Sequence, residues 1–122
     1  LDYGYTGFGG KDTMQCVSKH EYADLLASPG AQDITAHVNF SHVAEQAMIH
    51  GMTVHGPVSQ RRFLSALGIE MRANILKQDV SKMASEEIDT ALNRLTGPDQ
   101  MGHLFKALAI CGDPALDLKG FA

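Results

Sequence analysis

Apolar residues recur at helical spacing in several stretches of the chain, and capping or stop residues bound each stretch. The first predicted helix starts at Asn39 or Ser41, because either side-chain oxygen can accept an N–H that the first turn leaves unpaired, and it stops at Gly51. Four apolar residues recur at helical spacing, namely Phe40, Val43, Ala44 and Ala47, while His42, Glu45, Gln46 and His50 fall on the other side. The pattern therefore predicts an amphipathic helix that lies on a core.

Two further helical regions follow. Ser59 caps a helix, and the helical pattern resumes beyond Gly68, a kink or a break, to about residue 80. The expected buried stripe of this region is Phe63, Leu64, Leu67 and Met71. Ser85 and the two glutamates after it mark the start of the last helix, because acidic residues favour the positive end of the helix dipole. This helix ends at 96–98 and has the clearest amphipathic stripe: Ile88, Ala91, Leu92 and Leu95.

Runs of strand length lie between and after these helices. Residues 52–58 form one run, in which Pro57 has no N–H to give a sheet, so the strand ends there or lies at an edge. Residues 104–110 are almost continuously apolar, which is typical of a strand covered on both faces inside an α/β sheet. A helix, a short turn and a strand in this order favour an α/β layer over a helical bundle.

The N-terminal third is expected to be mostly extended. Residues 12–17 alternate as in a short strand, and residues 33–38 are extended and lead into the first helix. Residues 20–27 fit either a return strand or a helical turn. Ser28-Pro29-Gly30 predicts a turn, because proline presets φ and glycine can adopt a positive φ. Residues 114–122 are expected to form a tail.

Composition narrows the class of protein. The 122 residues are 44% apolar, enough for a core, and carry a net charge of −4. This charge argues against nonspecific nucleic-acid binding, which needs a basic face, and Arg61, Arg62 and Lys106 are too few to make one. No apolar run approaches the roughly 20 residues that a membrane helix requires. Cys16 and Cys111 match no metal or redox spacing and are expected to be buried thiols.

A glycine-rich stretch, residues 4–10, precedes Lys11 and suggests a phosphate-binding loop. The P-loop pattern fails at both ends, because Tyr5 stands at its first glycine and Asp12 at its hydroxyl position. The dinucleotide-binding pattern also fails at Asp12. We expect a mobile surface loop here, with a lid over a substrate as the alternative.

The histidines and cysteines give weak signals. None of the six histidines makes the His-Glu-x-x-His pattern that places two imidazoles on one helix face, so no metal site is expected. Cys16 near His20 is the only adjacent nucleophile and base pair, and we interpret it as coincidence. Asp2, Tyr3 and Tyr5 are better candidates, because Leu1 reads as the end of a parallel strand, and α/β sheets bind ligands beyond such ends. A polar strand-exit turn is the alternative.

Short motifs recur in order along almost the whole chain: Asp2-Tyr3-Gly4, Asp12-Thr13-Met14-Gln15, residues 33–40, residues 54–60 with Phe63, Leu67-Gly68-Ile69, Leu95-Thr96-Gly97-Pro98, Met101-Gly102 and Leu104-Phe105-Lys106. Each motif alone is weak, but the ordered set is fairly specific. In this set the chain resembles the C-terminal part of the MidA family of class I S-adenosylmethionine (SAM)-dependent methyltransferases. This family includes the mitochondrial complex I assembly methyltransferase.

The resemblance implies that residues 1–122 are the C-terminal portion of a single methyltransferase domain, a Rossmann-like α/β sheet flanked by helices. The whole sheet would have seven strands. This chain would supply the end of the fifth strand and the last two, 52–58 and 104–110, with the final strand antiparallel to its neighbours. The cofactor-binding half would lie upstream, so no SAM-binding residue is expected here, and the isolated chain should be inactive. Leu1 in place of Met also suggests a missing upstream part.

The implied function is methyl transfer from SAM to a protein arginine, in mitochondria on a core complex I subunit. The expected partners are this protein substrate and a second copy in a homodimer, without nucleic acid or membrane insertion. The expected location is the bacterial cytoplasm or, in a eukaryote, the mitochondrial matrix. A non-catalytic assembly or interaction module that keeps the fold is the alternative, and an independent small α/β domain is a third interpretation. The candidates for the substrate cleft are Asp2, Tyr3, Tyr5, Asp12, Gln15 and His37.

Two residues depart from the family pattern. Asn39 stands where the family has Asp, and Leu25 stands where it has Pro. Asn and Asp both cap helices, so the first change is structurally mild. The second removes a turn-forming residue beside Asp24.

Overall fold

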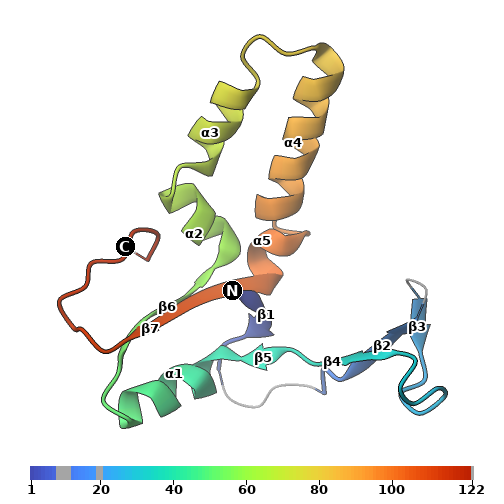
Figure 1. The fold of residues 1–122 in the computed structure, drawn as a ribbon, viewed down its shortest axis with the longest axis vertical. Helices are drawn as coiled ribbons and strands as arrows, with labels where there is room; N and C mark the ends of the chain where they lie inside the picture. Colours follow the sequence, from blue (N-terminus) through green and yellow to red (C-terminus); the bar gives the residue numbers. More distant parts are fainter. Residues whose placement is uncertain (8–11, 19–20, 122) are drawn as a thin grey trace.

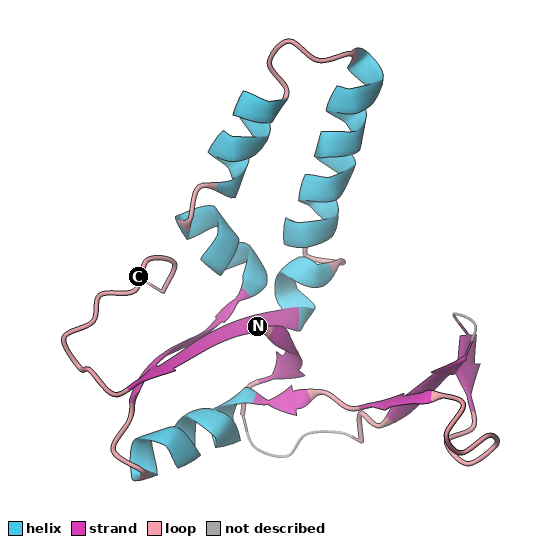
Figure 2. Ribbon diagram, viewed as in Figure 1, coloured by secondary structure: helices cyan, strands magenta, loops and turns pink. Residues whose placement is uncertain are grey.

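The computed structural model describes residues 1–7, 12–18 and 21–121, which form a mixed α/β structure with two sheets (Figures 1 and 2). The larger sheet has the strand order β5-β1-β7-β6. Its strands are β1 (Asp2–Tyr5), β5 (Val38–Asn39), β6 (Thr53–Ser59) and β7 (Phe105–Cys111). The smaller sheet has the order β3-β2-β4, and its strands are β2 (Gln15–Ser18), β3 (Glu21–Ala23) and β4 (Asp33–Thr35).

Strand β7 lies between β1 and β6 and runs antiparallel to both. The two predicted C-terminal strands therefore share one β-layer, and the expected antiparallel direction of the last strand is confirmed. Because β1 and β6 both oppose β7, they run parallel to each other and end at the same edge of the sheet, here called the carboxyl edge. The expected cover on both faces of β7 is wrong for the described residues, since Ala107 is buried but Ile110 is 44% exposed.

Strand β6 lies at the end of the larger sheet, as the proline in it predicts. The strand continues past Pro57 to Ser59, and its pairing with β7 shifts register between His55 and Val58. The irregularity accommodates a residue that cannot donate to the ladder, so an edge position tolerates the proline without ending the strand.

Helix α1 (Phe40–Ile49) begins and ends close to where the sequence predicts. The Asn39 Oδ1 accepts the His42 N–H at 3.1 Å, and Gly51 has φ +75° after the last turn. Phe40 and Ala44 are buried, whereas Val43 of the same apolar pattern is exposed. The helix thus covers the sheet with a narrower stripe than the pattern suggests.

Helices α2 (Gln60–Ala66) and α3 (Ile69–Leu76) are separated at Gly68, which has φ +85°. Ser59 caps α2 as predicted, its Oγ accepting the Arg62 N–H at 3.3 Å. The predicted stripe does not continue across the break: Leu67 and Met71 are exposed, because α3 takes a new direction after Gly68. The Gln60 side chain is buried at the start of α2, and its Nε2 donates to the Leu95 carbonyl at 2.8 Å.

Helix α4 (Lys82–Thr96) starts one turn earlier than predicted, because Ser81 and not Ser85 caps it. The Ser81 Oγ accepts the Ala84 N–H at 3.2 Å, and the helix ends at Gly97 as expected. Its amphipathic stripe faces α3 across an apolar hollow lined in part by Ile88, Leu92 and Leu95. The two helices project from the sheet as an arm and are bridged by Lys77 and Asp89 at 2.7 Å (Figure 1). The short α5 (Met101–Leu104) leads into β7.

The C-terminal tail returns to the body of the molecule. The Phe121 ring lies 5.1 Å from the Phe63 ring of α2 and 6.2 Å from the His55 ring of β6, measured between ring centroids. Gly120 is buried beside Phe63, where a Cβ would meet the ring at 2.6 Å. The tail is therefore packed in place by aromatic contacts. Along the described ranges, no helix has the length and apolar character needed to cross a membrane.

The N-terminal third differs from expectation in two places. Gly4 and Tyr5 belong to β1, so the glycine-rich stretch begins as a strand, while residues 8–11 of the predicted loop lie outside the described residues. The open choice at 20–27 resolves into strand β3 followed by a turn, in which the Asp24 Oδ1 accepts the Leu26 N–H at 2.9 Å. The turn forms without a proline at position 25, because the hydrogen bond of the Asp24 side chain holds the turn instead. The turn at Ser28–Gly30 is confirmed, since the Ala31 N–H bonds the Ser28 carbonyl at 3.1 Å.

Candidate functional site

An aromatic cluster formed by Tyr3, His37 and Phe105 lies near the carboxyl edge of the larger sheet. The Tyr3 ring meets the His37 ring edge-on, with centroids 5.4 Å apart and planes at 74°. It meets the Phe105 ring in the same way, at 5.5 Å and 72°. Tyr3 and Phe105 are paired residues of β1 and β7, so their side chains share one face of the sheet. All three rings are half-buried, which leaves part of the cluster open to solvent.

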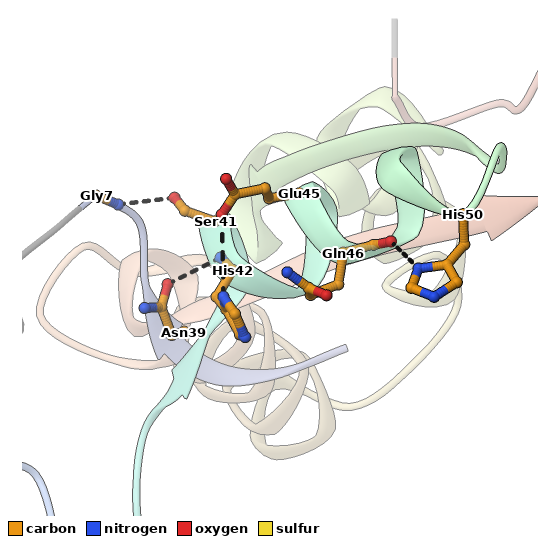
Figure 3. Close-up of polar contacts among 7 residues, drawn as sticks. All are labelled: Gly7, Asn39, Ser41, His42, Glu45, Gln46 and His50. Carbon is orange, nitrogen blue, oxygen red and sulfur yellow. Dashed lines mark hydrogen bonds and ion pairs between the residues drawn. The ribbon is translucent and has the colours of Figure 1, made fainter.

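Hydrogen bonds from separate segments hold this edge together. The Thr13 Oγ1 accepts the backbone N–H of His37 at 3.0 Å, which ties the start of the smaller sheet to the cluster. The Ser41 Oγ accepts the Gly7 N–H at 2.8 Å, so the residue just past β1 is fixed to the first turn of α1 (Figure 3). Asn39 caps the same turn and pairs with Tyr5 in the sheet. These contacts fix where the chain leaves β1.

The six predicted cleft residues do not all meet. Tyr3 and His37 are in direct contact, and Tyr5 lies on the same face of β1 as Tyr3. Asp2 is exposed at the start of β1, and its Oδ1 accepts the N–H of Tyr3 at 2.8 Å. Asp2 and Tyr3 therefore lie within a strand, and the prediction that Leu1 ends that strand is wrong. The strand extends because its partners β7 and β5 pair with residues 2–5.

The other two candidates lie in β2 of the smaller sheet and in the segment just before it. Asp12 is exposed, and its Oδ1 accepts the Met14 N–H at 3.0 Å. Gln15 is half-buried in β2, opposite Thr35 of β4. Neither side chain contacts the aromatic cluster in the described hydrogen bonds and ring contacts. Their place in the cleft stays a prediction.

Sequence reasoning missed two members of this region, Phe105 and Thr13. Phe105 lies in a run that predicts a strand, and nothing in one sequence gives the register that puts it opposite Tyr3. Thr13 lies in the predicted strand 12–17 and contributes a side-chain oxygen that the alternating pattern does not single out. The motifs Asp12-Thr13-Met14-Gln15 and Leu104-Phe105-Lys106 were the available signals.

Lys106, next to Phe105, is a titratable group of this region whose environment shifts its pKa. Burial lowers its pKa, because desolvation disfavours the charged ammonium. The Lys106 Nζ donates to the carbonyl oxygens of His103 and Leu104, at the end of α5. The ammonium therefore caps the helix that leads into β7, and it is bound to backbone rather than free for a ligand.

The remaining candidate groups do not form a centre. Within residues 1–7, 12–18 and 21–121, no three His, Cys, Asp or Glu side chains lie close enough to hold a metal ion. Cys16 is 1% exposed, as expected for a buried thiol, and its Sγ donates to the Gln32 Oε1 at 2.6 Å. Its suggested partner His20 lies outside the described residues. On α1, His42 lies 3.9 Å from Glu45 and His50 bonds the Gln46 carbonyl, both on the exposed side (Figure 3).

The residues that the structure describes do not fit the usual SAM site. Such a site places a glycine-rich turn between a strand and the N-terminus of a helix. Here the element after β1 is another strand, β2, and the helix nearest the carboxyl end of β1 starts from Asn39 without a glycine turn. We therefore assign no step of the chemistry to SAM bound by these residues.

Comparison with known proteins identifies relatives over most of the chain. A family described as putative S-adenosyl-L-methionine-dependent methyltransferase matches residues 1–58. The mitochondrial protein arginine methyltransferase NDUFAF7 homolog of Drosophila melanogaster is 39% identical over 113 residues, which cover 90% of this chain and 25% of that protein. The NDUFAF7 protein of Xenopus tropicalis is 33% identical over 89% of this chain and 25% of its own length. The chain thus spans about a quarter of these relatives.

Two solved structures from Burkholderia thailandensis have the same fold. An uncharacterized protein superposes with a TM-score of 0.82 at 29% identity, covering 99% of this chain and 32% of that chain. A protein described as a likely methyl transferase bound to S-adenosyl-homocysteine superposes with a TM-score of 0.73 at 28% identity, covering 99% and 31%. These comparisons bear out the resemblance found in the sequence: over about nine-tenths of its length the chain is similar to part of these methyltransferases.

Proposed function

We propose that this chain is the C-terminal portion of a SAM-dependent methyltransferase domain that methylates arginine in a protein substrate. The observation that carries this proposal is the match, across about nine-tenths of the chain, to proteins named protein arginine methyltransferase. The family description and the relative bound to S-adenosyl-homocysteine support SAM as the methyl donor of the whole protein. SAM would be held mainly by residues outside this chain, since the described residues do not form that site.

The aromatic cluster would orient the acceptor. A guanidinium group is planar and cationic, and it is attracted to the face of an aromatic ring within about 6 Å of the centroid. Tyr3, Phe105 and His37 come from three segments and offer half-buried rings beside the carboxyl edge. Holding an acceptor nitrogen in line with a methyl donor would supply much of the rate, because positioning removes the entropy cost of the encounter.

The finer assignments extend the same proposal. The relatives are named mitochondrial, which supports a mitochondrial location for a eukaryotic source, and a bacterial source would place the protein in the cytoplasm. A core complex I subunit is the proposed substrate in mitochondria, and the homodimer stays part of the proposal. Asp2, Tyr5, Asp12 and Gln15 are proposed to line the wider cleft around the cluster.

The test is methyl transfer by the full-length protein from radiolabelled SAM to arginine-containing proteins, with methylarginine detected by mass spectrometry. Tyr3→Ala should lower kcat/KM at least about tenfold, while Tyr3→Phe, which keeps the ring, should stay within about twofold. His37→Ala should lower kcat/KM as well, and His42→Ala is its matched control, because His42 is exposed on α1. Methylation without loss in Tyr3→Ala would remove the cluster from the site. SAM binding without methylarginine would favour the non-catalytic module.

A further inference from the structure

The smaller sheet carries apolar side chains with unusually high exposure. Tyr22 is 82% exposed and Leu26 is 80% exposed, and Met14 and Ile34 are exposed as well. This sheet extends away from the larger one, beyond β5 (Figure 1). Exposed apolar side chains that gather on one structural unit mark an interaction surface more often than scattered single ones do.

A hollow of about 520 Å³ lies on this sheet. It is formed by β2, β3 and the turn after β3, and its lining is Met14, Gln15, Cys16, Tyr22, Ala23, Asp24, Leu25 and Leu26. The turn is fixed, because the Asp24 Oδ1 accepts the Leu26 N–H and the Ala27 N–H bonds the Asp24 carbonyl at 3.2 Å. The hollow is thus a mostly apolar depression with one carboxylate at its border.

The hollow begins next in sequence to a residue that contacts the backbone of the aromatic cluster. Thr13 binds the backbone of His37, and the next residue, Met14, already lines the hollow. Cys16, which also lines the hollow, is three residues beyond Thr13, which is about 10 Å along an extended chain. A bound segment in extended conformation would therefore span the hollow and the cluster with about three residues.

The charge of this region selects a basic segment. Between Asp12 and Ala36 the sequence has four acidic residues, Asp12, Glu21, Asp24 and Asp33, and one basic residue, Lys19. The carboxylates would attract a segment rich in Arg or Lys and repel an acidic one. This complementarity distinguishes an arginine-bearing substrate segment from a second copy of this chain, which has the same negative charge.

We propose that the hollow receives an apolar side chain of the extended, basic protein segment whose arginine lies against Tyr3, His37 and Phe105. This inference rests on the proposed arginine methylation and names the substrate class: a segment with a Leu-like residue about three positions from the target arginine. The hollow supplies binding energy remote from the reacting nitrogen, which serves to place that nitrogen.

The experiment uses the full-length protein and fluorescein-labelled peptides of Gly, Ser and Lys that contain one Arg. Two peptides carry Leu three residues before or after the Arg, and two matched peptides carry Ser there. Fluorescence anisotropy measures each Kd, and a separate assay with SAM measures methylarginine. Leu26→Lys removes an apolar wall of the hollow and adds a repelling charge. Met71→Lys is the matched control, since Met71 is 70% exposed on α3, away from the hollow.

The wild-type protein should bind a Leu peptide about tenfold more tightly than its Ser counterpart at one of the two spacings. Leu26→Lys should reduce this preference below twofold, and Met71→Lys should keep it. Equal binding of Leu and Ser peptides at both spacings, or an intact preference in Leu26→Lys, would overturn the inference. Leu-dependent binding without methylarginine would refute the proposed function alone, and methylation without a Leu preference would refute the hollow alone.

Discussion

Gly4 lies where β1, β5 and α1 meet, and the absence of a side chain makes that contact possible. A Cβ at this position would stand 2.8 Å from the Phe40 ring and closer still to the Val38 carbonyl oxygen. The Val38 oxygen belongs to the backbone and cannot rotate away, so Gly4→Ala must separate β1 from β5. We expect a loss of about 1–3 kcal/mol in the free energy of unfolding, measured by urea denaturation.

Gly112→Ala provides the control for this substitution, because a Cβ at Gly112 would meet no atom within 4 Å. It should leave the free energy of unfolding within about 0.5 kcal/mol of wild type. Wild-type stability in Gly4→Ala would mean that the strand and helix do not pack as closely as described.

At the level of single residues, the sequence predicted some of the residues of the candidate site but not the contacts that they make. Tyr3 and His37 were both candidates, and they do meet, but Asp2 and Asp12 turn their carboxylates to nearby backbone N–H groups. Such local bonds depend on one rotamer and one turn, which residue identity does not determine. Phe105 was not a candidate because its role depends on strand register, a long-range property.

Helices α2 and α3 are joined across Gly68 by a side-chain hydrogen bond. The Ser65 Oγ donates to the Glu70 Oε1 at 2.6 Å. This bond is the largest cause of the lowered pKa of Glu70; the backbone N–H of Glu70 also lowers it, burial opposes the shift, and Arg61 lowers it least. Ser65→Ala should therefore raise the Glu70 pKa toward its ordinary value of 4.5, and Arg61→Ala should raise it less. Carboxyl ¹³C NMR titration measures both changes.

The sign of the linked stability follows from the same shift. A folded-state pKa below the unfolded value means that the interaction stabilises the fold above the unfolded pKa and is lost as the pH falls through the folded pKa. Ser65→Ala should therefore weaken the acid dependence of stability in the acidic range below pH 4.5. A Glu70 titration that is the same in Ser65→Ala and wild type would show that the hydroxyl is not the cause.

The helix boundaries were predicted well where the capping residue and the apolar stripe of the helix agree, and less well elsewhere. Asn39, Ser59 and Gly97 bound helices as expected. The start of α4 was misplaced because Ser81 and Ser85 are both acceptable caps one turn apart, and local sequence does not choose between them. The stripe through Met71 failed because Gly68 redirects the chain. The tail was not expected to pack, since Phe121 gains its place only from distant partners, Phe63 and His55.

At the scale of the whole molecule, the large sheet brings the ends of two parallel strands, β1 and β6, to the edge where we propose the site. β1 and β6 end at the same edge because β7 runs antiparallel to both. Two of the sequence motifs that indicate the resemblance, residues 2–4 and 54–60, overlap these two strands. The described residues bury only part of their apolar side chains. Large apolar side chains are exposed on α1 and on the α3–α4 arm, whereas buried apolar residues are few in the described part of the chain. This pattern agrees with the proposal that further residues of a longer protein cover these faces.

The same proposal predicts how the isolated 122-residue chain responds to SAM. In the described residues a strand follows β1, and α1 starts without a glycine turn. These residues therefore form no strand–turn–helix to hold the cofactor, so calorimetric titration with SAM should give no saturable heat. The full-length protein, titrated in the same buffer, should bind SAM with one site per domain. Because an unfolded chain would also fail to bind, the isolated chain must first show a cooperative unfolding transition. Saturable binding by the folded isolated chain would place the cofactor site within these residues and contradict the proposed division of the domain.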